Sequence, residues 1–230
     1  MLGKKKQVAR NAFGSVLILA FTAVPGAFAA DETGWYLGAG YGQSEAAVDK
    51  AKINGAYVTG SYTSASTTAD ETDTGWKLFG GYQFTRNWAA ELAYVDLGKF
   101  STNTRATAAG GTDEYRHEGK AKGWGIAGVG TAMVSDSFGV FGKLGAFLWD
   151  LDTTCSVARN VTGSAACAAP VNRSASGTDL TYGLGLKYNL TKQTSLRVEW
   201  EQFKDVGNAS ITGSSGTGQA DVNLISIGIQ

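Results

Sequence analysis

The sequence predicts an all-β fold, an eight-stranded antiparallel up-and-down transmembrane β-barrel, from three observations. Large apolar residues alternate with glycine, small or charged residues over eight segments, which is the two-residue period of a β-strand. Tight turns and long polar connections alternate between these segments. The chain has 32 glycines at strand spacing but only 2 prolines, which is not the composition of a disordered chain.

The first four expected strands lie near residues 34–43, 75–84, 88–95 and 122–134. Their apolar faces are formed by Trp35, Leu37 and Tyr41, by Trp76, Leu78, Tyr82 and Phe84, by Trp88, Leu92 and Tyr94, and by Trp124 and Ile126. Only residues 85–87 separate the second from the third strand, so these two should form a hairpin.

The last four expected strands lie near residues 138–149, 178–190, 196–201 and 221–230. Their apolar faces are formed by Val140, Leu144 and Leu148, by Leu180, Tyr182, Leu184, Leu186, Tyr188 and Leu190, by Leu196, Val198 and Trp200, and by Ile225, Ile227 and Ile229. Tight turns are expected at residues 135–137 and 191–193.

Four long polar segments are expected as loops, at residues 44–74, 98–121, 150–177 and 207–220. All of them fall at one end of the strands and the tight turns fall at the other, which is the plan of a transmembrane β-barrel. Aromatic residues near strand ends fit the interfacial girdles of such barrels: Trp35, Trp88, Tyr94, Tyr188 and Trp200.

A soluble eight-stranded barrel is the alternative, and it places apolar residues inside and polar residues outside. The period alone cannot distinguish the two. The second face, however, combines charges with many glycines, while the apolar face is almost uncharged. A face exposed to water is rarely so rich in glycine, so we interpret the apolar face as the one that meets lipid.

The first 29 residues are typical of a secretory signal peptide, which leaves a barrel domain at residues 30–230. Four basic residues precede the apolar run 16–24, and Ala27 and Ala29 flank Phe28 as a signal peptidase requires. No other stretch approaches the ~18 apolar residues of a membrane helix, which excludes a helical membrane protein.

Charge and cysteine content exclude other classes. Removal of the basic leader leaves a mildly acidic chain without a basic stripe, so no nucleic-acid partner is expected. Cys155 and Cys167 are the only cysteines and lie in a polar segment of a secreted chain, which predicts a disulfide. Because no histidine lies nearby in the sequence, we expect no metal site there.

The strands resemble the transmembrane domain of the outer membrane protein A (OmpA-like) family of Gram-negative bacteria. The matching stretches are GWYLGAGYG (34–42), FGGYQFTRNWAAELAYVDLG (79–98), FGKLGAFLWD (141–150), YGLGLKYNLTKQTSLRVEWEQF (182–203) and NLISIGI (223–229). They cover every expected strand except 122–134, which matches weakly.

This resemblance implies a monomer in the cell outer membrane, surrounded by lipid and lipopolysaccharide and inserted by the barrel-assembly machinery. It implies a structural, surface-exposed protein, with weak small-solute or ion pore activity in some members. The alternatives are a surface adhesin acting through its loops and a lipid-modifying barrel enzyme. The family's last strand usually ends in an aromatic residue, whereas this sequence stops at Gln230, so we expect either a shortened chain or an atypical insertion signal. No peptidoglycan-binding domain follows that strand, so wall anchoring is not expected.

The resemblance also implies ion pairs inside the barrel. Glu91, Lys143, Arg197 and Glu199 occupy inward positions where the family usually has a like-charged residue, whereas Lys187 replaces a usual carboxylate. If residue 190 pairs with residue 194 across the turn, Lys187 lies opposite Arg197, which is unfavourable without a nearby carboxylate. We therefore expect one network of these five residues that closes the barrel, since buried charges are tolerated only when paired.

Catalysis is not expected. His117 is the only histidine, and Asp113, Glu114 and Glu118 lie near it in the sequence. A Ser-His-acid site would need one positioned serine, and no serine of the polar segments stands out. We therefore expect a solvated histidine, no cofactor and no enzymatic activity.

Overall fold

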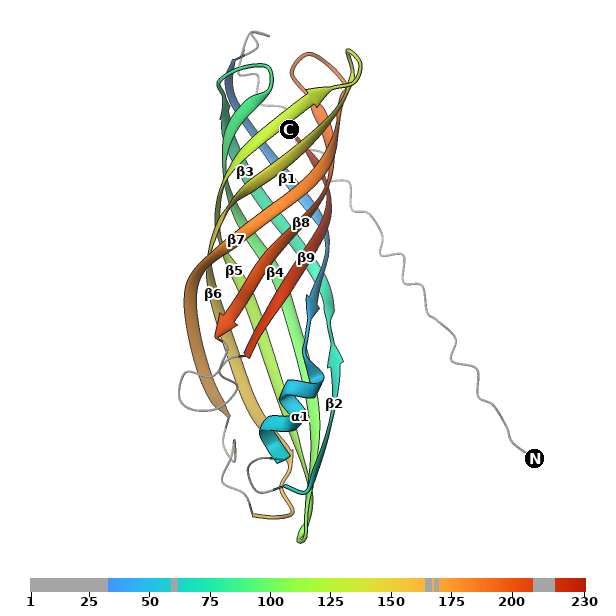
Figure 1. Ribbon diagram of the computed structural model, residues 1–230, viewed down its shortest axis with the longest axis vertical. Helices are drawn as coiled ribbons and strands as arrows, with labels where there is room; N and C mark the ends of the chain where they lie inside the picture. Colours follow the sequence, from blue (N-terminus) through green and yellow to red (C-terminus); the bar gives the residue numbers. More distant parts are fainter. Residues whose placement is uncertain (1–32, 59–61, 164–166, 168–169, 209–217) are drawn as a thin grey trace, which may run out of the picture.

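Eight antiparallel strands form a closed ring in the computed structural model, which describes residues 33–58, 62–163, 167, 170–208 and 218–230 (Figure 1). Going around the ring, β3 is followed by β1, β9, β8, β7, β6, β5 and β4, and β4 pairs again with β3. The predicted eight-stranded up-and-down barrel is confirmed. The expected signal peptide lies outside the described residues and stays a prediction. No helix of the described chain has the length and apolar character needed to cross a bilayer.

The strands of the ring differ in length. Their bounds are β1 Gly34–Ala47, β3 Thr72–Gln83, β4 Trp88–Ala108, β5 Gly111–Met133, β6 Phe138–Arg159, β7 Val171–Asn189, β8 Ser195–Asn208 and β9 Gly218–Ile229. A short strand, β2 (Ser64–Asp70), pairs with β4, and a nine-residue helix, α1 (Lys50–Val58), follows β1. The tight turns lie together at the top of Figure 1.

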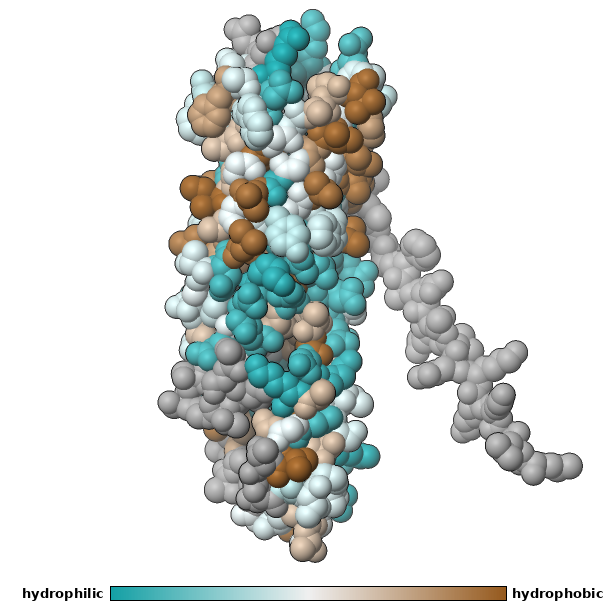
Figure 2. Space-filling view, viewed as in Figure 1, coloured by the Kyte–Doolittle hydropathy of each residue, from teal (hydrophilic) through white to brown (hydrophobic). Residues whose placement is uncertain are grey.

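The large apolar side chains of the ring point away from the lumen, as predicted. Leu37 on β1 and Leu184 on β7 are 80% and 65% exposed, whereas the inward Phe79 on β3 and Phe141 on β6 are each 4% exposed. On the face that Figure 2 shows, the apolar side chains gather in the upper half of the molecule. This outward face is the one that meets lipid.

Two groups of neighbouring aromatic rings mark the edges of the apolar band. Near the tight turns, Tyr82 lies 5.1 Å from Trp35 and 5.3 Å from Phe84, measured between ring centroids. Toward the other end, Tyr94 lies 5.6 Å from Trp76 and 5.2 Å from Trp124. Their positions fit the two interfacial girdles of an outer-membrane barrel.

The predicted long loops were partly wrong, because strand pairing continues beyond the apolar band. Residues 98–121 are almost entirely the β4–β5 hairpin, which closes between Ala108 and Gly111. Within 150–177, β6 continues to Arg159 and β7 begins at Val171, and 44–74 contains α1 and β2. Outside the lipid both faces of a sheet can meet water, so the apolar alternation ends although the backbone pairing does not.

One residue, Glu71, separates β2 from β3, so β2 takes over the pairing along β4 where β3 has ended. The Glu71 carboxylate accepts a hydrogen bond from the Val48 amide at 3.3 Å and pairs with Lys50 at 2.9 Å. Asp49 caps the helix by accepting from the Lys52 amide at 2.9 Å. These contacts hold α1 at the end of the ring opposite the tight turns.

That end of the molecule is a partial wall rather than a ring. β8 ends at Asn208 and β9 begins at Gly218, while β4 to β7 continue further (Figure 1). We call α1, β2 and residues 99–120, 150–159 and 171–177 the extension. Because outer-membrane barrels place short turns in the periplasm and long connections outside, we expect the extension to lie on the cell surface.

Candidate functional site in the barrel lumen

The described part of the chain places three cations and three carboxylates together inside the ring. We call them the charge cluster: Lys77, Lys143, Arg197, Glu91, Glu199 and Glu201. Each comes from the inward face of its strand, and none is more than 6% exposed. The equal numbers of opposite charges allow every member to be paired, which is the condition for burying charge.

The two lysines bridge the three carboxylates. The Lys143 ammonium lies 2.8 Å from Glu91, 3.0 Å from Glu199 and 3.3 Å from Glu201. The Lys77 ammonium lies 2.7 Å from Glu199 and 2.9 Å from Glu201. Because β3, β4, β6 and β8 contribute these groups, the cluster ties strands from different parts of the ring together.

Arg197 completes the cluster toward the tight turns. Its Nη1 donates to Glu91 at 2.8 Å and its Nη2 donates to Glu199 at 3.2 Å. The guanidinium carbon lies 4.5 Å from the ring centroid of Phe79 and 4.4 Å from that of Phe141. Two aromatic rings and two carboxylates thus fix the guanidinium, and cation–π attraction adds to the ion pairs.

The structure brings together four of the five residues expected in the interior network, namely Glu91, Lys143, Arg197 and Glu199. It does not bring in Lys187. The predicted register is confirmed, since Lys187 pairs with Arg197 in the β7–β8 ladder. Arg197, however, pairs with Glu91 and Glu199, and Lys187 has no ion pair within the described chain.

Lys77 and Glu201 belong to the cluster although sequence reasoning did not include them. Both lie on the charged face of their strands, which was visible in the alternation. Their ion-pair partners could not be predicted from the sequence, because Lys77 on β3 contacts Glu201 on β8 only across the lumen. Contacts of this kind depend on ring closure rather than on neighbouring strands.

An apolar layer lies between the charge cluster and the extension. It includes Phe147 and Phe203, whose ring centroids are 4.5 Å apart, and Leu97 and Leu224. All four are completely buried. Two layers therefore fill the lumen along the barrel axis, the charge cluster near the tight turns and the apolar layer nearer the extension.

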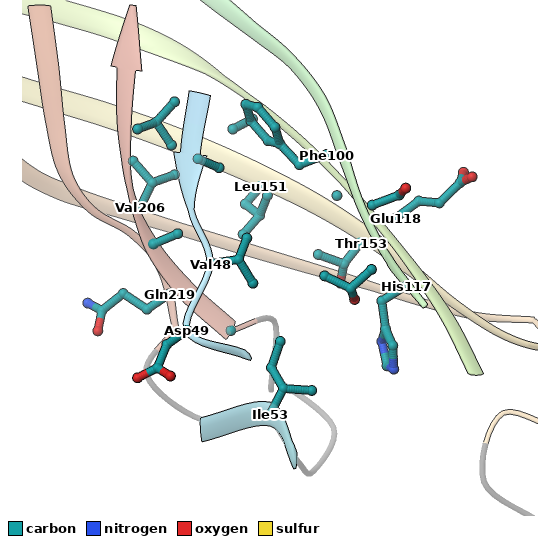
Figure 3. A pocket seen from close by; sticks show the side chains of 18 of the residues that line it. Val48, Asp49, Ile53, Phe100, His117, Glu118, Leu151, Thr153, Val206 and Gln219 are labelled. Carbon is teal, nitrogen blue, oxygen red and sulfur yellow. The ribbon is translucent and has the colours of Figure 1, made fainter. Parts of the chain in front are cut away.

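On the side of this layer that faces the extension, the structure has a cavity of about 150 Å³, which we call the mouth cavity (Figure 3). Its floor includes Leu151, Val206 and Val222, which also belong to the apolar layer. Ile53 of α1 lines it from the side of the extension, and polar residues line its edge, including Asp49, Lys52, His117, Glu118, Thr153, Arg173 and Gln219.

His117 lies on the inward face of β5 and is half-buried. Its Nε2 is 2.9 Å from the Tyr57 hydroxyl and 3.7 Å from Cys155 Sγ. Burial lowers the pKa of His117, and the nearby Arg173 guanidinium lowers it further. The imidazole is therefore neutral at pH 7, unlike the solvated histidine that the sequence suggested.

Cys155 is buried beside His117, and a disulfide joins it to Cys167 with a Cα–Cα distance of 5.8 Å. Among the described residues, no group of three or more His, Cys, Asp or Glu side chains is placed to hold a metal ion.

Asp113 joins the tip of the β4–β5 hairpin to neighbouring segments. The buried carboxylate accepts hydrogen bonds from the Tyr62 hydroxyl at 2.7 Å, the Val161 amide at 2.6 Å and the Thr162 amide at 3.0 Å. Burial alone would raise the pKa of Asp113, but these bonds and one from the Thr162 hydroxyl hold it below its usual range. A single carboxylate thus fastens the hairpin tip of the extension to Tyr62 and to residues 161–162, which adjoin the extension.

Comparisons with known proteins agree with this architecture. The chain is 25% identical over 215 residues to Outer membrane protein A of Salmonella typhi, which covers 94% of this chain and 52% of that protein. It therefore spans about half the length of this curated relative.

Solved structures of similar shape include the attachment invasion locus protein Ail of Yersinia pestis, with a TM-score of 0.44 and 16% identity, covering 86% of this chain and 97% of that one. Neisserial surface protein A has a TM-score of 0.43 and 11% identity, with coverage of 86% and 97%. OprG of Pseudomonas aeruginosa has a TM-score of 0.40 and 14% identity, with coverage of 84% and 94%.

The family model described as the OmpA-like transmembrane domain matches residues 30–230. The chain therefore belongs to the OmpA-like transmembrane domain family and is an integral β-barrel protein of the cell outer membrane.

Proposed function

We propose that the chain is a structural, surface-presenting outer-membrane barrel whose lumen is closed at rest. The observation that carries this proposal is the filling of the lumen by two stacked layers, the charge cluster and the apolar layer. An ion crossing the barrel would have to separate buried ion pairs and then pass packed phenylalanine rings. Each step leaves charge uncompensated in a buried site, which costs several kcal/mol. Any pore activity should therefore consist of rare, brief openings.

Planar-bilayer recording tests the closed state. We expect the folded wild-type barrel to give no steady conductance. Removing one cation and one carboxylate together, in the double variant Lys143→Ala/Glu201→Ala, keeps the cluster neutral but reduces its volume, so openings should become more frequent. A steady wild-type conductance at every insertion would contradict the proposal.

Leu144→Ala is the matched control, because Leu144 lies next to Lys143 on β6 but faces lipid and is 63% exposed. It should behave as the wild type. A mobility shift on gels between unheated and boiled samples shows whether each variant is folded before its conductance is interpreted.

A surface adhesin is the second candidate, and the extension favours it. β4 to β7 carry a folded wall of strands beyond the apolar band, and the disulfide and Asp113 fasten it. A rigid, polar surface is suited to contact with a partner. Loss of cell attachment when residues 150–177 are exchanged for a short turn, in a barrel that still shows the gel shift, would support this role. Unchanged attachment would show that residues 150–177 are not the adhesive surface.

We infer that the chain is not an enzyme. Within the described residues, the His117 imidazole contacts a tyrosine hydroxyl and a disulfide sulfur rather than a serine nucleophile or an orienting carboxylate. The arrangement that a hydrolase requires is therefore missing from its surroundings. Hydrolysis of phospholipid or lipopolysaccharide by the wild type, lost in His117→Ala, would overturn this inference.

We also infer a monomer embedded in outer-membrane lipid and lipopolysaccharide. The β4–β5 pairing closes the ring, so no strand edge within the apolar band is left to pair with another copy. Insertion by the barrel-assembly machinery follows from membership of the family. Chemical crosslinking in native membranes should give a single-chain species, and a specific dimer would contradict the inference.

A further inference from the structure

We propose that the mouth cavity binds a small, uncharged, largely apolar group, of the size of one aromatic ring or a short alkyl segment, with one hydrogen-bonding group. The inference does not depend on the closed lumen or on adhesion.

The volume and the floor of the cavity define the apolar part of this ligand. The cavity measures about 150 Å³, and its floor is the outer surface of the apolar layer, including Leu151, Val206 and Val222. A cavity of about this volume has room for a benzene-sized molecule. Water would find few partners on this floor, so hydrocarbon is the better occupant.

Among the described residues, the covering helix α1 does not fill this space. α1 has nine residues, and none of them is buried. Ile53 lines the cavity but is only half-buried, although its side chain lies over an apolar floor (Figure 3). A bound hydrocarbon would bury Ile53 and the floor together, which gives a favourable free energy in proportion to the apolar area removed from water.

The edge of the cavity defines the polar part. His117 and Thr153 lie beside the apolar floor and supply one ring nitrogen and one hydroxyl. Because burial lowers the pKa of His117, this edge offers a neutral partner at pH 7. His117 and Thr153 therefore suit a hydroxyl or carbonyl group, and they lie among the charged side chains that also line the cavity, namely Asp49, Lys52, Glu118 and Arg173.

Two sources could supply this chemistry, a free small molecule or the end of a lipid acyl chain. The test uses the folded chain in lipid nanodiscs with labelled methyl groups, and it follows Leu151 and Val206 by NMR. Phenol is the free probe, toluene is its counterpart without a hydroxyl, and a phospholipid with a nitroxide at the acyl end is the lipid probe.

Ile53→Trp should fill the cavity from the helix without changing the barrel. Val58→Trp is the matched control, since Val58 lies on the same helix, is 44% exposed and does not line the cavity. We expect saturable phenol shifts in the wild type and in Val58→Trp, at least about tenfold weaker binding in Ile53→Trp, and weaker binding of toluene than of phenol.

Methyl broadening by the labelled lipid, abolished by Ile53→Trp but not by Val58→Trp, would support the same site with an acyl chain as its occupant. Shifts that grow linearly with phenol and are equal in all three proteins would show partition into the bilayer only. That result, together with no selective broadening by the lipid, would overturn the proposal.

Discussion

Lys143 and Lys187 are lysines of the same lumen with opposite surroundings. Lys143 meets three carboxylates within 3.3 Å. Lys187 instead lies across the β7–β8 ladder from Arg197. A buried cation is stabilised by its partners and destabilised by a neighbouring like charge, so the two side chains should respond differently to neutralisation.

We expect Lys143→Gln to lower the free energy of unfolding by about 3–5 kcal/mol, because three buried carboxylates then face only two cations. Lys187→Gln removes repulsion and should leave the stability unchanged or raise it by about 1 kcal/mol. Urea unfolding in detergent micelles, followed by tryptophan fluorescence, measures both. Equal destabilisation by the two substitutions would show that Lys187 shares the carboxylates in solution.

The pKa of His117 predicts how the extension responds to acid. Because the folded pKa is lowered, the unfolded segment binds more protons than the folded one between the ordinary value, about 6.5, and the lowered value. Stability should therefore fall as the pH drops below about 6.5, and it should stop falling below the lowered pKa.

Hydrogen exchange checks this prediction. The amides of α1 and of residues 115–119 should lose protection between pH 7 and pH 5, after correction for the intrinsic exchange rate, whereas those of the membrane-spanning strands should not. His117→Asn should remove the change. A pH effect that persists in this variant would assign it to another group.

The strands of the ring could be predicted from the sequence because lipid on one side and a narrow lumen on the other impose a strict two-residue period. β7 was identified from residue 178 onward for this reason. Its first part, from Val171, reads VNRSASG and meets water, so it lacks apolar alternation. Only a high serine and threonine content marks these outer strand segments in the sequence, and loops have the same composition, so the sequence does not distinguish the two.

The helix α1 could not be predicted from the sequence either. It buries none of its residues, so it has no apolar stripe of helical period. Its position depends on the Asp49 cap and on Glu71, which is far along the chain. Similarly, the inward direction of Lys77 and Glu201 followed from alternation, but their meeting required the closed ring.

Strand pairing depends on glycine where two backbones come unusually close. A Cβ at Gly145 on β6 would lie 2.0 Å from the Ile126 carbonyl oxygen of β5, whereas one at Gly125 would meet its nearest atom at 4.0 Å. Both glycines face the lumen on adjacent strands. They differ in the space available for a Cβ, and so provide a pair for comparison.

Gly145→Ala should force β5 and β6 apart and cost about 1–3 kcal/mol, with a smaller folded fraction on gels of unheated samples. Gly125→Ala should fold as the wild type. Refolding yields into micelles and urea midpoints compare them. If both variants behave alike, the close approach relaxes in solution and does not limit folding.

At the scale of the whole molecule, the chain has two parts, one surrounded by lipid and one surrounded by water. The ring buries charge and presents hydrocarbon to lipid. The extension has water on its outer face and is held by hydrogen bonds, a disulfide and α1. The lumen contacts that hold the ring together come from Lys77, Glu91, Lys143, Arg197 and the residues packed around them, and none of these lies in the extension.

Removing the hairpin of the extension therefore tests whether the ring is self-sufficient. We expect a chain in which residues 100–119 are replaced by Asn-Gly to fold, because Lys99 and Lys120 already pair and a two-residue turn can join them. Its gel shift and β-type circular dichroism should persist, since the charge cluster and the apolar band are intact.

Phenol binding at the mouth cavity should disappear, since Phe100 and His117 are lost. Failure of this chain to fold, with the matched replacement of residues 160–170 tolerated, would mean that the β4–β5 hairpin forms early and that the ring closes only after it.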